Sequence, residues 1–263
     1  MPDEPPDEVV VDRSDAIMTV RINRPEARNA MNVAVMAGIG GGLLDAEADE
    51  QVRAVVLTGT GDRAFCAGMD LRAFAEGGMT PGDDQKVGME GFATFIRGGF
   101  STPVIGAANA SAVAGGFELL MACDLIVASD GAQFGIPEAK RGLFAAGGGV
   151  FLPRRIPLAI ALELGMTGDV IDAGRASELG LVNRVVPPGD VLRTAVELAA
   201  RIAANGPLGV QATRKLMRAA ASMTDEEVWA LQAELQPGVF GSEDAKEGSR
   251  AFIEKRAPAW KGR

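Results

Sequence analysis

Short apolar runs alternate with longer amphipathic segments along the first 190 residues of the chain. The apolar runs, which turn-forming residues mostly bound, predict strands at residues 9–11, 17–22, 53–58, 103–108 and 124–128. The segments between them predict helices at residues 31–48, 70–76, 86–98 and 117–122. Because strands and helices alternate in this way, we expect an α/β fold.

The pattern changes near residue 190, beyond which no strand is predicted. Amphipathic segments predict helices at residues 190–204, 207–221, 224–235 and 242–256. We therefore divide the chain into three parts. These are a flexible N-terminal tail of Pro and acidic residues at 1–8, a core at 9–190 and a helical C-terminal region at 191–263.

Composition and charge limit the class of protein. The chain has 263 residues, of which 47% are hydrophobic and 23% charged, the proportions of a folded globular protein. A net charge of −9 argues against a nucleic-acid partner, since such binding depends on Lys and Arg neutralising phosphates. No apolar run reaches the roughly 20 residues that a membrane-spanning helix needs. We expect a cytoplasmic protein with no membrane partner.

The chain contains neither His nor Tyr, which narrows the chemistry that it can perform. Triads and metal sites that depend on His are excluded, so acid–base work must fall to Asp, Glu, Lys or Cys. Cys66 and Cys123 are too few for a disulfide framework and are not spaced as metal ligands. We interpret them as reduced, packed thiols and expect no metal.

Two turns are candidates for holding a negatively charged oxygen. Ala67–Asp70 follows a predicted strand and leads through a glycine into a helix, and Ala114–Glu118 repeats this arrangement after another strand. The first turn of a helix has free N–H groups, and two such groups that converge on one oxygen form an oxyanion hole. The alternative, that both are tight packing turns, stays open at this point.

Two carboxyl groups lie beside turns 20 residues apart, at Glu118 and at Glu138. Paired carboxyl groups can divide acid and base roles when their surroundings separate their pKa values. Taken alone, the residues favour a simpler interpretation in which each glutamate offsets a helix dipole. The nearby Gly147–Gly149 lacks the Lys-Ser/Thr of a phosphate-binding loop, and we interpret it as packing at a helix entry.

The order of several segments decides between these interpretations. Along nearly its whole length the sequence resembles the crotonase (enoyl-CoA hydratase/isomerase) superfamily. The matching segments are Asn23–Asn32, Phe65–Leu71, Ala114–Leu119 and Gln133–Glu138, with Glu247-Gly248 and Phe252–Arg256 near the C-terminus. The resemblance implies a crotonase-like spiral of ββα units with a helical C-terminal region that forms homotrimers or dimers of trimers.

The resemblance also implies a set of catalytic groups. The main-chain N–H groups of Met69 and Gly115 would form the oxyanion hole for a thioester carbonyl. Glu118 would take a proton from water, and Glu138 would deliver one to the α-carbon of the substrate. The sequence departs from the superfamily pattern at Asn109-Ala110, at Ala114, where a glycine run usually begins, and at Ala146, where a glycine often helps to position the water.

Coenzyme A (CoA) would be held by two loops. The resemblance implies backbone contacts of Ala27 and Ala30 with the adenine and contacts of Arg28 and Arg72 with the phosphates. The alternative that both arginines are solvated surface charges stays open. Lys255 would approach the CoA of a neighbouring subunit. The other implied binding residues lie in the second loop, at Ala67, Gly68, Asp70 and Leu71, where Asp70 also suits a supporting role.

The function implied is that of an enoyl-CoA hydratase in fatty acid or lipid metabolism, which adds water to a 2-enoyl-CoA. No cofactor is expected, because CoA is part of the substrate. Two alternatives stay open. The chain could be a double-bond isomerase or another lyase that uses Glu138 as a proton shuttle, or a non-catalytic protein that binds acyl-CoA as a scaffold.

Overall fold

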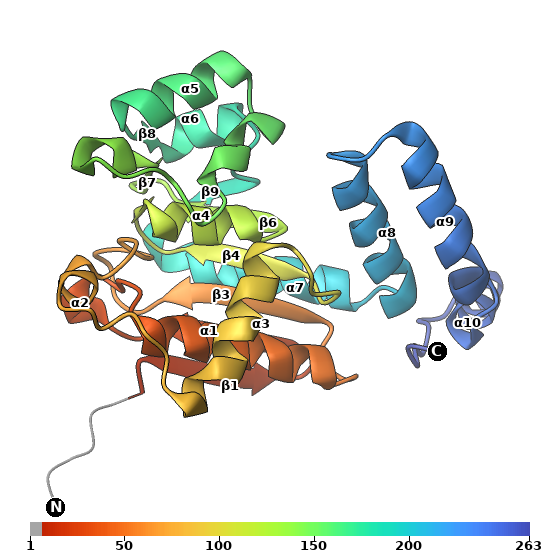
Figure 1. The fold of residues 1–263 in the computed structure, drawn as a ribbon. Coiled ribbons are helices and arrows are strands. Elements are labelled where there is room, and N and C mark those ends of the chain that lie inside the picture. The colour runs from red at the N-terminus through yellow and green to blue at the C-terminus, as the bar shows by residue number, and fades with distance from the viewer. Residues whose placement is uncertain (1–6) are drawn as a thin grey trace, which may run out of the picture.

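The computed structural model describes residues 7–263 and contains two β-sheets (Figure 1). The larger sheet has six strands in the order β1-β2-β3-β4-β6-β9. These strands are β1 (Val9–Ser14), β2 (Ile17–Ile22), β3 (Ala54–Gly59), β4 (Val104–Ala108), β6 (Leu125–Ser129) and β9 (Arg184–Val186). The smaller sheet has three short strands in the order β5-β7-β8, which are β5 (Ala112–Val113), β7 (Gln133–Gly135) and β8 (Ile171–Asp172).

The large sheet is parallel except at one edge, where β1 and β2 form an antiparallel hairpin whose turn pairs Ser14 with Ile17. From β2 onwards each neighbour is parallel, through β3, β4, β6 and β9. Every residue of β3 and β4 is buried. This explains why both strands are continuous apolar runs in the sequence, since a parallel strand is covered on both faces.

Helices cover both faces of the large sheet (Figure 1). On one face α1 (Val33–Ala48) and α3 (Lys86–Ile96) pack against each other, and Val55 and Leu57 of β3 point into that core. On the other face α7 (Val191–Ala203) covers Ala54 and Val56. Successive residues of one strand therefore serve two hydrophobic cores.

Shorter helices complete the core region. They are η1 (Pro25–Ala27), α2 (Leu71–Ala75), η2 (Asp83–Gln85), α4 (Gly115–Ala122), η3 (Pro137–Arg141), η4 (Gly149–Arg154), α5 (Leu158–Thr167), α6 (Ala173–Glu178) and η5 (Pro188–Asp190). The helix at α4 begins at Gly115, two residues before its predicted start at Phe117. Among the described residues, no helix is both long enough and apolar enough to cross a membrane.

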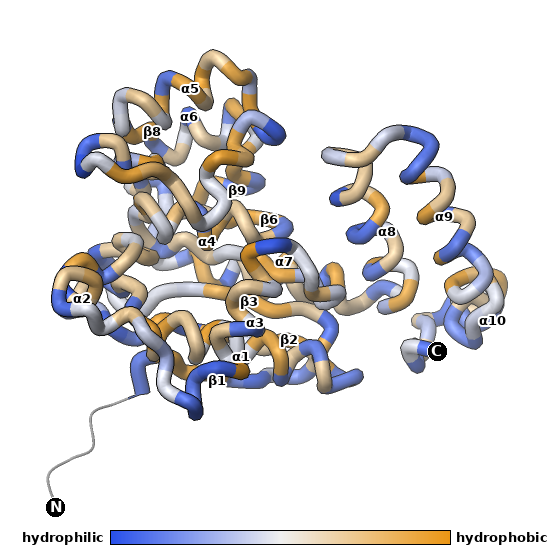
Figure 2. Tube along the Cα trace, viewed as in Figure 1, coloured by the Kyte–Doolittle hydropathy of each residue, from blue (hydrophilic) through white to orange (hydrophobic). Residues whose placement is uncertain are grey.

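The last three helices form an arm beside the sheets (Figure 1), and Arg214 and Arg218 of its first helix form ion pairs with Asp124. It consists of α8 (Pro207–Ala220), α9 (Asp225–Phe240) and α10 (Glu243–Glu254). Neither α8 nor α9 contains a buried residue, although hydrophobic residues recur along both (Figure 2). The helical region predicted at 191–263 is therefore divided in the structure: α7 packs on the sheet, and the separate arm begins at Pro207.

The N-terminal tail predicted at residues 1–8 falls mostly outside the described residues. Its last two residues are bound to the core. The Asn23 amide side chain donates to the Asp7 carbonyl at 3.1 Å, and the Asn23 N–H donates to the Glu8 carbonyl at 2.7 Å. The Glu8 carboxylate forms an ion pair with Arg24 at 3.0 Å. Residues 7 and 8 are thus attached to the core by these contacts.

Glycine at position 40 allows α1 and α3 to touch through their backbones. A Cβ atom on Gly40 would lie 1.8 Å from the Gly88 carbonyl oxygen and 2.3 Å from the Phe92 nitrogen of α3. Its neighbour Gly41 lies in the same helix, and a Cβ atom there would meet nothing within 4 Å. The two neighbouring glycines of α1 therefore differ in role, because this contact requires glycine at position 40 but not at position 41.

The two glycines provide a matched pair for measuring this contact. Gly40→Ala should destabilise the protein by about 1–3 kcal/mol, because the added methyl group must push two helix backbones apart. Gly41→Ala should stabilise it by about 0.5–1 kcal/mol, the difference in helix propensity. Urea unfolding followed by far-UV circular dichroism measures both. Equal effects of the two substitutions would contradict a specific contact at Gly40.

Candidate active site

Glu118 lies in the first turn of α4 and is buried, with 6% of its surface exposed. Its Oε1 atom accepts two hydrogen bonds from main-chain amides, those of Gly147 and Gly149, each at 2.8 Å. Burial raises the pKa of this carboxyl group, and the two amides oppose the rise. The glycine turn that we interpreted as helix-entry packing thus holds one of the two candidate carboxylates.

Glu138 lies on η3, where Pro137 begins the helical turn. Its Oε2 atom is buried and has no hydrogen-bond partner among the described residues. Burial raises the pKa of Glu138, its own main-chain amide opposes the rise, and the negative charge of Glu118 adds to it. The two predicted carboxyl groups therefore interact electrostatically, and only Glu118 is held by amides from another segment of the chain.

Two main-chain N–H groups meet at the start of α4, the helix whose first turn contains Glu118. Gly115 is the first residue of α4, so its amide has no partner within the helix. A Cβ atom on Gly68 would lie 3.2 Å from the Gly115 nitrogen, and a Cβ atom on Gly115 would lie 3.6 Å from the Met69 nitrogen. The amides of Met69 and Gly115 are therefore neighbours across the two turns. Neither amide appears in a hydrogen bond within the described part of the chain.

A strained residue directs the Gly115 amide. Ala114 has a φ of 52° and a ψ of −134°, a positive-φ conformation that residues with a Cβ atom rarely adopt. Its amide is fixed by donation to the Gly135 carbonyl at 2.9 Å, and its carbonyl accepts from Phe117 and Glu118. Strain of this kind concentrates at functional sites, where the surrounding structure compensates for it. The departure from glycine at Ala114 therefore leaves the turn intact.

The two loops predicted to bind CoA lie side by side. The Ala67 amide donates to the Arg28 carbonyl at 3.1 Å, the Met31 amide to Gly68 at 2.8 Å, and the Asp70 amide to Met31 at 2.8 Å. These bonds bring the predicted residues of the first loop next to those of the second. The first set is Ala27, Arg28 and Ala30, and the second is Ala67, Gly68, Asp70, Leu71 and Arg72.

The charged residues of these loops differ in their availability. Arg28 and Arg72 are exposed and take part in no ion pair within the described range 7–263. The Asp70 carboxylate is engaged instead, because it accepts from the amides of Arg72 and Ala73 and pairs with Arg24 at 3.1 Å. The amide of Ala73 and the Arg24 guanidinium hold the pKa of Asp70 below its usual value. Asp70 therefore supports the loop.

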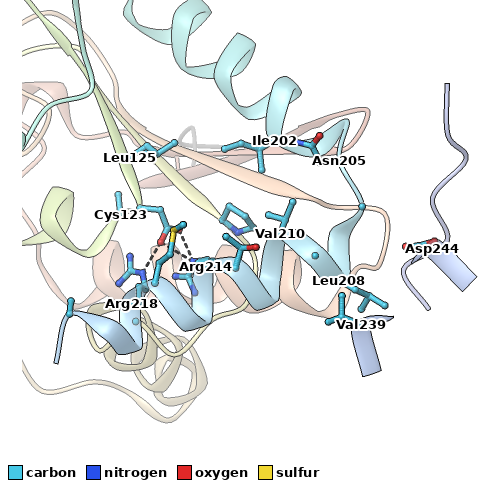
Figure 3. A pocket seen from close by; sticks show the side chains of 18 of the residues that line it. Cys123, Leu125, Ile202, Asn205, Leu208, Val210, Arg214, Arg218, Val239 and Asp244 are labelled. Carbon is cyan, nitrogen blue, oxygen red and sulfur yellow. Dashed lines mark hydrogen bonds and ion pairs between the residues drawn. The ribbon is translucent and has the colours of Figure 1, made fainter. Parts of the chain in front are cut away.

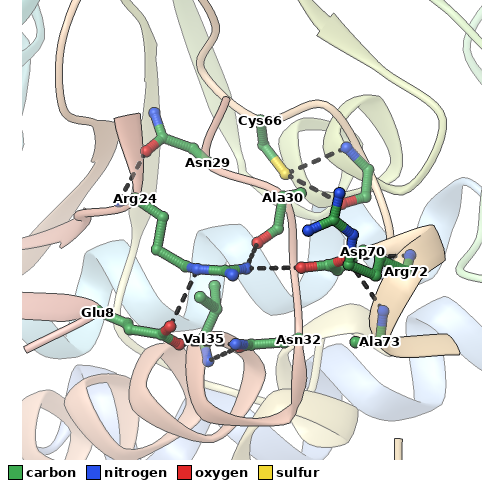
Figure 4. Close-up of polar contacts among 11 residues, drawn as sticks. Glu8, Arg24, Asn29, Ala30, Asn32, Val35, Cys66, Asp70, Arg72 and Ala73 are labelled. Atoms are coloured by element: carbon green, nitrogen blue, oxygen red, sulfur yellow. Dashed lines mark hydrogen bonds and ion pairs between the residues drawn. The ribbon is translucent and has the colours of Figure 1, made fainter. Parts of the chain in front are cut away.

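Arg24 joins both loops, and the sequence predicts no role for it, although it lies in the matched segment Asn23–Asn32. Figure 4 shows its guanidinium between the Glu8 carboxylate, the Ala30 carbonyl at 2.8 Å and Asp70. The Arg24 amide is also held by the side chain of Asn29, which is completely buried. Its place in that segment was the only signal in the sequence, since Glu8 and Asp70 lie far from it along the chain.

Lys255 is not brought to this site within one chain. It ends α10 with a left-handed φ of 54°, in the arm at the opposite side of the molecule from α2 (Figure 1). The thiols are buried. Burial raises the pKa of Cys66 to about 12, and it also raises the pKa of Cys123. No group of three or more acidic or Cys side chains suited to a metal ion occurs in the described range.

Residues 12–263 match the model of a protein family described as enoyl-CoA hydratase/isomerase. The chain belongs to this family. It is 41% identical over 261 residues to enoyl-CoA hydratase EchA19 of Mycobacterium tuberculosis, covering 97% of both chains. It is 40% identical over 253 residues to the carnitinyl-CoA dehydratase of Proteus mirabilis, covering 94% of this chain and 96% of the other.

A crystal structure of an enoyl-CoA hydratase from M. tuberculosis superimposes on this fold with a TM-score of 0.89, at 44% identity, covering 98% of this chain and 100% of the other. These findings confirm the predicted superfamily, the crotonase fold with its helical C-terminal region, and the class of enzyme, a hydratase. The α/β spiral expected from the sequence is the fold observed.

The raised pKa of Glu138 leads to a prediction about stability. Since its pKa is higher in the folded state than in the unfolded chain, folding retains a proton and stability falls as the pH rises through that pKa. Glu138→Gln removes this penalty. The melting temperature of the variant minus that of the wild type should therefore become more positive between pH 4 and pH 8.

The measurement is differential scanning calorimetry at a series of pH values, with the exposed Glu50→Gln as the control. A difference that stays constant with pH for Glu138→Gln, or that is reproduced by Glu50→Gln, would show that the Glu138 carboxyl group is not shifted in this direction.

Proposed function

We propose that this enzyme is an enoyl-CoA hydratase that adds water across the double bond of a 2-enoyl-CoA and releases a 3-hydroxyacyl-CoA. The observation that carries the proposal is the pair of differently held carboxyl groups, Glu118 and Glu138, together with the neighbouring amides of Met69 and Gly115, which have no hydrogen-bond partner in the described part of the chain. Relatives named for enoyl-CoA hydration and carnitinyl-CoA dehydration, at about 40% identity, support the same chemistry.

In this proposal the thioester carbonyl oxygen accepts hydrogen bonds from the Met69 and Gly115 amides. These bonds stabilise the negative charge that develops on the oxygen, and they make the β-carbon electrophilic. Glu118 takes a proton from a water molecule as its oxygen bonds to the β-carbon. Glu138 delivers a proton to the α-carbon, and the enolate collapses to the product. The dehydration reaction exchanges these duties.

CoA is bound, in the same proposal, along the paired loops 27–31 and 67–72. The backbone of Ala27 and Ala30 contacts the adenine, and the exposed Arg28 and Arg72 meet the phosphates. This local positive charge is needed because the protein as a whole is acidic, with a net charge of −9. CoA enters as part of the substrate, so the reaction requires no separate cofactor or metal.

Glutamine substitutions test the two catalytic assignments. Glu118→Gln and Glu138→Gln should each lower kcat/KM for hydration by about 10²–10⁴-fold, because an amide neither accepts nor donates the transferred proton. The assay follows 3-hydroxyacyl-CoA by mass across thioesters of different chain length, which also reveals the acyl preference.

Two outcomes of this assay would contradict the proposal. Double-bond isomerisation that persists in Glu118→Gln, with no hydration at any chain length, would identify an isomerase that depends on Glu138. Tight acyl-CoA binding without turnover of any thioester would identify a non-catalytic scaffold.

We also propose that the arm assembles three copies of the chain, alone or as paired trimers. Support comes from a cavity of about 1110 Å³ between α8 and the sheet region (Figure 3). Its lining combines apolar residues with Arg154, Arg155, Arg214 and Arg218, while the nearby exposed face of α9 carries Trp229. An arm without buried residues on α8 and α9 gains most of its stability from packing against another surface.

Size-exclusion chromatography with light scattering tests this assembly. We expect three or six times the chain mass of 27.2 kDa, and in that assembly Lys255 can approach the CoA of a neighbouring copy. A monomeric mass at micromolar concentration would contradict the proposal. For the hydratase function proposed above, we also propose a role in lipid metabolism and a location in the cytoplasm.

A further inference from the structure

The turn at residues 145–149 donates hydrogen bonds to only one of the two carboxylate oxygens of Glu118. Both donated hydrogen bonds, from Gly147 and from Gly149 at 2.8 Å each, end on Oε1. Gly148, between them, has a φ of +116°, a conformation that residues with a Cβ atom rarely adopt. Two amides separated by one residue can point at a single oxygen only because Gly148 reverses the chain in this way. The turn is therefore a small anion-binding nest occupied by a carboxylate of the same chain.

The same turn has no room for side chains. A Cβ atom on Gly147 would lie 2.6 Å from Glu118 Oε2, and one on Gly149 would lie 2.5 Å from the Cβ of the buried Ala145 and 3.0 Å from Glu118 Oε1. Glycine is thus needed at both positions for the amides to come this close. By contrast, Ala146 is exposed and donates no hydrogen bond to Glu118.

No comparable donors reach Glu138 from another segment. Its Oε2 atom is buried without a partner in the described part of the chain. Hydrogen bonds donated to a carboxylate favour its ionised form, whereas a buried oxygen without a donor favours the protonated form. The two carboxyl groups therefore differ in the way that separates a base from an acid in one site.

We propose that Gly147 and Gly149 are positioning residues which keep Glu118 ionised, with Oε2 directed at the reacting water, and so determine that Glu118 rather than Glu138 takes the water's proton. This inference rests on the hydratase function proposed above. It assigns a role in that reaction to the glycine turn, which acts through Glu118 and touches neither substrate nor water itself.

If the glycines act through Glu118, their substitution should impair hydration selectively, because only the reaction with water depends on Glu118. In Gly147→Ala and Gly149→Ala, kcat for hydration should fall by about 10²-fold or more. A second reaction depends on Glu138 and the oxyanion hole alone, namely exchange of the α-hydrogen of butyryl-CoA with deuterium oxide. In that exchange Glu138 takes the α-proton, the enolate is held by the Met69 and Gly115 amides, and a deuteron returns to the same carbon.

Exchange should stay within a few-fold of the wild-type rate in both variants, while hydration is lost. Gly131→Ala is the matched control, because a Cβ atom there meets nothing within 4 Å, and it should change neither rate. Glu118→Asp is a second variant that leaves the turn intact. It withdraws the carboxylate from both amides by one methylene group and should show the same selective loss. Equal losses of hydration and exchange in these variants would overturn the proposal.

A titration separates this inference from the proposed function. In protein labelled with ¹³C at the glutamate carboxyl carbons, the signals of Glu118 and Glu138 are assigned through their Gln variants. The pKa of Glu118 should rise in Gly147→Ala, because the displaced carboxylate loses hydrogen bonds that favour its ionised form. An unchanged titration in the folded variant would overturn the positioning role. A wild-type enzyme that hydrates no thioester but shows this shift would overturn the hydratase assignment alone.

Discussion

Two carboxyl groups interact in one site, and main-chain amides from a distant turn hold only one of them, the buried Glu118. The hydrogen bonds from Gly147 and Gly149 to Glu118 depend on nearly everything else in the core region. They require α4 to begin at Gly115, which the strained Ala114 makes possible. They also require α4 to lie close to the loop that contains Cys66. Glycine at position 116 allows this approach, because a Cβ atom there would lie 2.1 Å from the Cys66 carbonyl oxygen. The site is thus built from close backbone contacts at glycines.

The parallel sheet explains why these turns meet. β3 and β4 are neighbours with the same direction, so the loops that follow them leave from the same edge of the sheet. The side chain of Asn109 joins those loops, accepting from the Gly59 amide at 3.2 Å and donating to the Gly61 carbonyl at 2.6 Å. The pair Asn109-Ala110 departs from the superfamily pattern, but its Asn109 still bridges the two loops that carry the candidate oxyanion amides.

Sequence reasoning predicts those features that depend on neighbouring residues. The apolar runs of β3 and β4, the helix N-terminus at Glu118 and the α/β alternation all follow from local patterns. The holding of Glu118 does not, because its donors lie 29 and 31 residues away and a glycine triplet has the same letters whether it packs or binds. Arg24 was missed for the same reason, and only the fold shows that Glu8, Ala30 and Asp70 surround it.

The joint between the sheets and the arm has a consequence for experiments on this protein. It is made largely of polar contacts, such as those from Arg53 to the carbonyls of Ala203 and Trp260. The chain has two tryptophans and no tyrosine; Trp229 lies on α9, and Trp260 lies beside the joint, where its indole N–H donates to Ala204. Intrinsic fluorescence therefore reports detachment and melting of the arm. A change in tryptophan fluorescence at low denaturant concentration would therefore measure the arm. The unfolding of the catalytic region has to be followed by another signal, such as circular dichroism.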